Sequence, residues 1–153
     1  MTKTHSEIPF RCALHMKMAI YRAVFAHLSR AASTNAESLQ MIHYGPAQEY
    51  AAHFDAWDPA TERGERCMAK GGQRLVTCLL YLNDVGAGGA TGFPELGLEV
   101  PAKRGRMLVF YNCYPGTNVR QPKSLHGGLP VLRGEKLACN FWFRERAVQP
   151  LRD

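Results

Sequence analysis

The sequence predicts a mainly β domain, a sandwich or a barrel, preceded by one helix. Two observations support this class. Most apolar runs have the length of a strand and are separated by turns that contain Gly or Pro, and one stretch near the N-terminus has helical spacing. The 153 residues, 46% hydrophobic and 21% charged, suit one globular domain with a core. No internal repeat or shift in composition indicates a second domain.

The predicted helix covers residues 18–32, where apolar side chains recur at helical spacing: Ile20, Val24, Leu28 and Ala31. Polar groups lie between them, so we expect an amphipathic helix on the outside of the core. Three small polar residues, 33–35, then end the helix. Residues 1–37 are therefore expected to form a helical lead-in to the domain.

From residue 39 onward the pattern predicts strands. The run from residue 74 to 84 is apolar almost throughout, which is typical of a strand buried on both faces. The polar or Gly/Pro-rich stretches between strands are expected to be loops. The expected strands are 39–44, 49–55, 74–84, 98–102, 105–112, 125–131 and 136–143, and the main loops are 58–72, 85–97 and 114–124. This pattern places the domain at residues 38–147 and a short tail at 148–153.

Charge and cysteine content limit the partners and the compartment. The formal net charge is +6, but Lys and Arg are scattered, with no block of five or six, so we expect no nucleic-acid partner. Five cysteines without a C-x-x-C pair exclude a zinc ribbon and indicate a reducing compartment. No apolar run approaches the ~20 residues needed to span a bilayer, and the first residues lack an apolar signal core. We therefore expect a cytoplasmic protein without a membrane partner.

Three residues have the composition of a metal site. His53 and Asp55 form an H-x-D step, and His126 lies 71 residues beyond Asp55. Two imidazoles and one carboxylate are the ligands of non-haem Fe(II) oxygenases, which leave other metal positions open. Residues i and i+2 of a strand share a face, so His53 and Asp55 can bind one ion from a strand end. Lys136, ten residues past His126 with a Gly-containing turn between them, strengthens the prediction.

Three runs together resemble the catalytic domain of prolyl 4-hydroxylases: HYGPAQEYAAHFDAWD at 43–58, the run at 71–112 that begins GGQRLVTCLLYLND and ends GRMLVFYN, and SLHGGLPVLRGEKLACNFWFRER at 124–146. The resemblance covers about residues 38–146, with the runs in the family's order. It implies a double-stranded β-helix, or jelly roll. It also implies a dioxygenase that uses Fe(II), 2-oxoglutarate and O₂ to hydroxylate prolyl residues in a peptide or protein, releasing succinate and CO₂.

The resemblance also implies a role for individual residues. The iron ligands would be His53, Asp55 and His126. Lys136 would pair with the distal carboxylate of 2-oxoglutarate, and Tyr44 and Thr91 would donate hydrogen bonds to it. These types suit a dianion, which needs one buried cation and hydroxyl donors.

The implied substrate site has one cation and two aromatic residues: Arg74, Tyr50 and Trp142. Lys136 and Trp142 are six residues apart on one expected strand, so both side chains can face the same cavity. The chain also departs from the family pattern, because Ala47 stands where glycine is usual and Gly92 stands where a larger residue is usual.

Two alternatives remain beside prolyl hydroxylation. The same chemistry could act on a free amino acid or another side chain, or the chain could be a non-catalytic metal-binding module of cupin type. The complete set of three ligands with Lys136 favours an enzyme, because a decayed site would be expected to lose one of them. The sequence leaves open the oligomeric state and whether ascorbate is a further cofactor.

Overall fold

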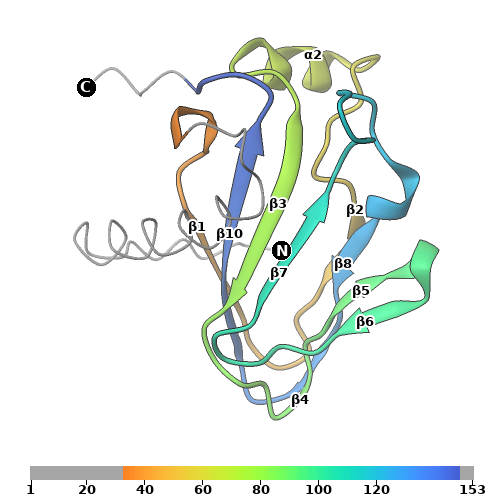
Figure 1. Cartoon of the computed structure of the whole chain (residues 1–153). Helices are drawn as coiled ribbons and strands as arrows, with labels where there is room; N and C mark the ends of the chain where they lie inside the picture. Colours follow the sequence, from red (N-terminus) through yellow and green to blue (C-terminus); the bar gives the residue numbers. More distant parts are fainter. Residues whose placement is uncertain (1–32, 149–153) are drawn as a thin grey trace.

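The computed structural model describes residues 33–148, and the predicted helix at 18–32 lies outside them. Two four-stranded antiparallel sheets form the domain (Figure 1). The larger sheet has the order β1 (Gln40–Tyr44), β10 (Lys136–Arg144), β3 (Arg74–Tyr81), β7 (Met107–Tyr111). The smaller sheet has the order β2 (Tyr50–His53), β8 (His126–Gly128), β5 (Thr91–Phe93), β6 (Leu98–Val100).

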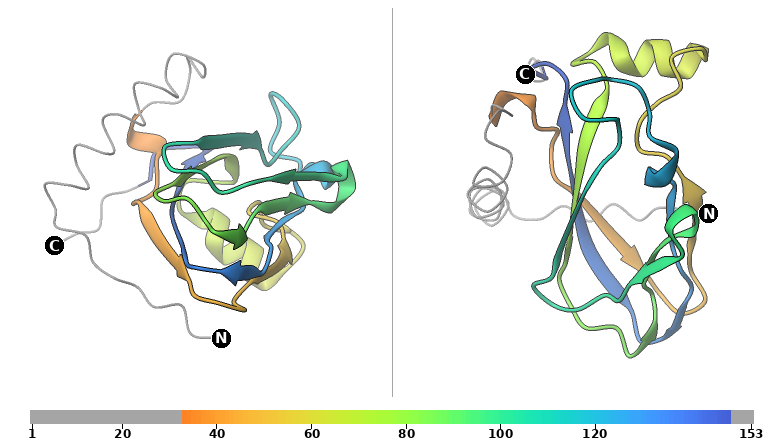
Figure 2. Two further views of the ribbon diagram at one scale, coloured as in Figure 1. Left: turned by 90° about the horizontal axis from the view of Figure 1, so that it is seen from below. Right: turned by 45° about the vertical axis from the view of Figure 1, so that its right-hand side comes forward.

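The two sheets face each other and close at one end, where β4 (Ala87–Gly88) pairs with β9 (Val131–Arg133) (Figure 2). This arrangement is the expected double-stranded β-helix, so the predicted fold class is confirmed. Among residues 33–148, no helix is long and apolar enough to cross a membrane.

The large sheet is buried on both faces, as the continuous apolar run of β3 predicts. One core cluster contains Val76, Cys78, Phe141 and Phe143, and the other contains Leu79, Tyr81, Ala102 and Ala138. Because successive side chains of a strand point to opposite faces, odd and even positions of β3 and β10 separate into these two clusters. The face that carries Ala138 also carries Lys136 and Trp142, which places both on the inner side of the sheet.

The loop prediction for residues 58–72 is wrong, because these residues contain helix α2 (Glu62–Ala69). Thr61 caps the helix by accepting a hydrogen bond from the Gly64 amide, and acidic residues occupy the first turn. Gly64 weakens the helical signal in the sequence. A side chain there would collide with the Asp58 carbonyl, so the local packing requires glycine.

Other boundaries also differ from the prediction. The expected loop 85–97 contains β4, β5 and a short 3-10 helix, Pro94–Leu96, and the expected loop 114–124 contains the 3-10 helix Pro122–Ser124. The expected strand 125–131 divides into β8 and the start of β9. Glycine and proline in these segments obscured two- and three-residue strands, which are too short to show a period.

The backbone conformation at position 47 shows why glycine is usual there in the family. Ala47 has φ of 61°, in the left-handed region, and it is the only non-glycine residue with positive φ among residues 33–148. Its amide donates to the Val131 carbonyl at 2.8 Å, so the tertiary structure holds this turn. A Cβ in this conformation costs about 1–2 kcal/mol, which gives a physical reason for glycine at this position.

Candidate metal and 2-oxoglutarate site

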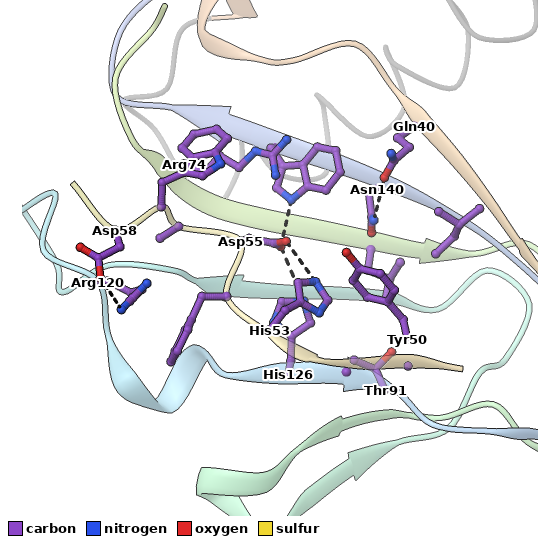
Figure 3. Close-up of a pocket in the computed structure, with 18 of the residues that line it drawn as sticks. Gln40, Tyr50, His53, Asp55, Asp58, Arg74, Thr91, Arg120, His126 and Asn140 are labelled. Carbon is purple, nitrogen blue, oxygen red and sulfur yellow. Dashed lines mark hydrogen bonds and ion pairs between the residues drawn. The ribbon is translucent and has the colours of Figure 1, made fainter. Parts of the chain in front are cut away.

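His53, Asp55 and His126 come together between the sheets, at the centre of Figure 3. One ligand atom from each lies within 4.8 Å of the others. His53 Nε2 is 3.6 Å from Asp55 Oδ1, and His126 Nε2 is 3.6 Å from Asp55 Oδ2. The strand β2 ends at His53, and Asp55 lies in a bend just beyond it. The prediction that Asp55 is part of this strand is therefore wrong. The pairing of His53 with His126 across β2 and β8 brings the distant histidine to the site.

Backbone carbonyls orient both imidazoles. His53 Nδ1 donates to the Ala51 carbonyl and His126 Nδ1 donates to the Ser124 carbonyl, each at 2.9 Å. With the proton on Nδ1, each Nε2 keeps its lone pair toward Asp55 and can bind a metal ion. Burial lowers the pKa of His126, although the Asp55 charge and the Ser124 carbonyl oppose this. A neutral imidazole is the form that binds metal.

Asp55 is buried and ionised. Burial alone would raise its pKa, but the interactions with His53 and His126 and the hydrogen bonds from Thr77 and Trp142 hold the pKa well below its usual range. Thr77 Oγ1 and Trp142 Nε1 both donate to Oδ2, at 2.6 and 2.9 Å. One anionic oxygen and two neutral nitrogens, with room for further ligands, are a donor set that fits Fe(II).

Lys136 lies in the same cavity and is 2% exposed. Burial lowers its pKa from 10.5 to about 8, and among residues 33–148 no acidic side chain pairs with it. Its Nζ lies 5.7 Å from the ring centroid of Tyr44 and 5.5 Å from that of Tyr81. Lys136 is therefore not a surface lysine, and a buried cation without a counterion suits an anionic ligand.

Two predicted hydroxyl donors line this cavity together with Lys136. Tyr44 is the register partner of Lys136 on β1, and Thr91 is 2% exposed on β5. The sequence did not indicate a third hydroxyl, that of Tyr81, which donates to Thr91 Oγ1 at 2.7 Å. This bond leaves the Thr91 proton for an acceptor in the cavity.

Arg74 borders the cavity, but its guanidinium is hydrogen-bonded to another residue of the protein. Its Nε and Nη2 donate to the two carboxylate oxygens of Glu37 at 2.7 and 2.8 Å. Its Cζ lies 3.8 Å from the Trp142 ring centroid and 4.6 Å from that of Trp57. Arg144 also binds Glu37, at 2.9 Å. Glu37 is therefore shared by two guanidinium groups, and the predicted substrate role of Arg74 stays a prediction.

Trp142 and Tyr50 occupy different depths of the cavity. Trp142 is 6% exposed and binds Asp55 through its indole nitrogen, so it supports the metal site directly. Tyr50 is 37% exposed at the mouth, and its ring centroid lies 4.2 Å from that of His53 (Figure 3). Of the three predicted substrate residues, Tyr50 is therefore the most accessible to a large ligand.

Sequence reasoning missed several polar residues of the site. Gln40 and Asn140 line the cavity side by side, with Asn140 Nδ2 donating to Gln40 Oε1 at 3.4 Å (Figure 3). Arg120, from the segment before β8, lies over Phe54 and pairs with Asp58 at 3.5 Å. None belongs to a local motif, and alternation along β10 is the one signal that could have indicated Asn140, four residues after Lys136.

Comparisons with known proteins agree with this geometry. The chain is 43% identical over 112 residues to a protein of Acanthamoeba polyphaga mimivirus that carries the provisional name of a prolyl 4-hydroxylase, covering 73% of this chain and 46% of that protein. It is 38% identical over 128 residues to prolyl 4-hydroxylase 5 of Arabidopsis thaliana, covering 71% of this chain and 42% of that protein. The chain thus spans less than half the length of either relative.

A solved structure is also similar, that of the viral collagen prolyl hydroxylase of Paramecium bursaria Chlorella virus-1 with 2-oxoglutarate. It superposes with a TM-score of 0.72 at 29% identity, covering 96% of this chain and 79% of that one. The family model described as the 2OG-Fe(II) oxygenase superfamily matches residues 39–144, from the start of β1 to the end of β10. This match includes all three candidate ligands and Lys136, and it shows that the chain belongs to the 2OG-Fe(II) oxygenase superfamily.

Proposed function

We propose that this chain is an Fe(II)- and 2-oxoglutarate-dependent dioxygenase that hydroxylates prolyl residues in a peptide or protein. One observation carries the proposal: the His53, Asp55 and His126 cluster shares one cavity of about 430 Å³ with the buried cation of Lys136. The prolyl 4-hydroxylase names among its relatives support the choice of substrate.

One group of cavity residues would bind 2-oxoglutarate and another would bind the metal ion. Lys136, with Tyr44 and Thr91, would hold the distal carboxylate of 2-oxoglutarate. The two histidines would hold the metal ion through their Nε2 atoms, and Asp55 would hold it through one carboxylate oxygen. Bound Fe(II), with O₂ and 2-oxoglutarate, supplies the oxidation that couples decarboxylation to C–H hydroxylation. The protein contributes placement and exclusion of water, because Asp55, His126 and Lys136 are all buried.

The mouth of the cavity supports a peptide substrate. Tyr50 is exposed beside His53, and Phe54 lies beneath the guanidinium of Arg120 at 4.4 Å. Proline-rich segments are already extended as polyproline II, so they bind aromatic surfaces at low entropic cost. A peptide lying along Tyr50 and Phe54 would bring one prolyl ring toward the metal ligands.

A panel of substrates tests the proposal. The enzyme, with Fe(II) and 2-oxoglutarate, is incubated with a proline-rich peptide, the same peptide with alanine for proline, and free proline. We expect succinate above background and hydroxyproline by mass spectrometry for the proline peptide alone. Hydroxylation of free proline, or of a residue other than proline, would replace this substrate assignment. Absence of succinate in every arm would contradict the dioxygenase itself.

The proposal also includes a cytoplasmic location, which the sequence suggested, and a role for ascorbate, which the sequence left open. Cytoplasmic location would supply 2-oxoglutarate and keep iron reduced, and cell fractionation with an antibody to this chain tests it. Ascorbate would act by restoring iron to Fe(II) after turnovers that are not coupled to hydroxylation. Omission of ascorbate should then shorten the linear phase of succinate release without changing its initial rate.

A further inference from the structure

The Asp55 carboxylate is fixed on one of its two oxygens. Thr77 Oγ1 and Trp142 Nε1 donate to the same atom, Oδ2, at 2.6 and 2.9 Å. Thr77 lies in the middle of β3 and is 1% exposed, so water does not compete for its hydroxyl. Oδ1 is therefore the oxygen left for a metal ion. This depends on the Thr77 hydroxyl proton pointing toward Oδ2.

Asn112 sets that direction. Its Nδ2 donates to Thr77 Oγ1 at 2.8 Å, and Asn112 is 0% exposed just beyond the end of β7. A hydroxyl has one proton, and because the amide occupies a lone pair of Oγ1, the proton is directed to Asp55. The chain of donors thus runs from Asn112 through Thr77 to Asp55. The other amide atom, Oδ1, has no hydrogen-bond partner among residues 33–148, so the visible role of this buried amide is the Thr77 bond.

Hydrogen bonds fix the backbone of Asn112 and connect it to the segment that carries His126. Its amide donates to the Leu75 carbonyl at 2.8 Å, and its carbonyl accepts from Gln121 N at 2.9 Å and Ser124 Oγ at 3.3 Å. The Ser124 carbonyl in turn accepts from His126 Nδ1 at 2.9 Å. Asn112 therefore lies at the junction between β3, which carries Thr77, and the segment that carries His126.

We propose that Asn112 and Thr77 are positioning residues for the metal centre, which act in series to hold Asp55 in a one-oxygen binding orientation. Neither residue would touch the ion. Bonds that orient a ligand carboxylate are typically worth 10- to 100-fold in metal affinity. The inference rests on the metal site of the proposed function but not on the substrate, so failure of peptide hydroxylation would leave it intact.

The test measures Mn(II) affinity by electron paramagnetic resonance in the absence of 2-oxoglutarate and peptide. Thr77→Val removes the hydroxyl at nearly constant volume, and Thr77→Ser keeps it. We expect the valine variant to bind Mn(II) about 10- to 100-fold more weakly and the serine variant to stay within a few-fold of wild type. Thermal unfolding of each metal-free protein verifies the fold. Wild-type affinity in a folded Thr77→Val protein would overturn the proposal.

A double-mutant cycle tests whether the two residues act in series. Asn112→Asp keeps the shape of the side chain but turns the donor into an acceptor, which draws the Thr77 proton away from Asp55. We expect it to weaken Mn(II) binding in the wild-type background and to add little in the Thr77→Val background. An equal loss in both backgrounds would refute the serial arrangement. If the aspartate does not fold, Asn112→Ser in the same cycle gives the same comparison.

Discussion

Replacement of Lys136 by methionine should weaken 2-oxoglutarate binding while stabilising the metal-free fold. Burial lowers the Lys136 pKa from 10.5 to about 8, and one pKa unit corresponds to about 1.4 kcal/mol. The charged, unpaired lysine therefore costs the metal-free protein on the order of 3 kcal/mol, which methionine removes. A charge-assisted contact with the cosubstrate contributes about 1.5–3 kcal/mol, so the variant should bind 2-oxoglutarate roughly 10- to 150-fold more weakly.

The same pKa gives this prediction a pH window. Between about pH 8 and 10.5 the unfolded chain binds more protons than the folded chain, because Lys136 has the lower pKa when folded. The stability contribution of this group therefore rises with pH through that window, and Lys136→Met lacks the rise. The affinity for 2-oxoglutarate changes with pH in the opposite direction to the stability. The dianion requires the charged ammonium, so wild-type affinity should fall above about pH 8.

Calorimetric titration of 2-oxoglutarate into the Mn(II)-loaded protein measures the affinity, and urea unfolding of the metal-free protein measures the stability. Lys103→Met is the matched control, because Lys103 is exposed and lies outside the cavity lining. It should change neither quantity. Unchanged 2-oxoglutarate affinity in Lys136→Met would show that another cation binds the distal carboxylate. Lower stability of that variant would refute the reasoning on burial.

Three further variants test other parts of the site. Asp55→Ala removes the anionic member of the three candidate ligands, so Mn(II) binding and succinate release should both be lost while the circular dichroism spectrum is kept. A variant with wild-type turnover would contradict the assignment. Trp142→Phe removes one of two donors to Asp55 Oδ2 and should weaken Mn(II) affinity several-fold in calorimetry. Unchanged affinity would mean that the indole contributes packing and does not orient Asp55. Ala47→Gly relieves a positive φ and should raise the free energy of unfolding by about 1 kcal/mol in urea titrations; lower stability would mean that chain entropy outweighs the relieved strain.

The sequence was sufficient for the fold class because the strand signals are local. The apolar run of β3, the alternation along β10 and the Gly/Pro turns each act over a few residues. Helix α2 could not be recognised as readily, since Gly64 and a polar composition conceal it, although Thr61 and the acidic first turn are a start signal. The domain boundaries at residues 37 and 147 stay predictions.

The site was predictable where residue type and spacing carry the chemistry. The H-x-D step, His126 and Lys136 follow from the sequence and from the family resemblance, and the structure brings all four into one cavity. Thr77 and Asn112 could not be found in this way, because their roles depend on partners 22 and 35 residues away. A single hydroxyl in the middle of the apolar β3 run was the one available signal. Likewise, nothing in the sequence indicated that Arg74 pairs with Glu37.

The ratio of hydroxyproline to succinate in one reaction tests the central claim most directly. A proline-rich peptide is incubated with the enzyme, Fe(II) and 2-oxoglutarate, and both products are quantified by mass spectrometry over the linear phase. If the His53, Asp55 and His126 cluster and Lys136 form one site that couples the two substrates, the products should appear in equal amounts and both should require iron. Hydroxyproline formed without 2-oxoglutarate, or succinate released at the same rate with and without peptide, would contradict this account.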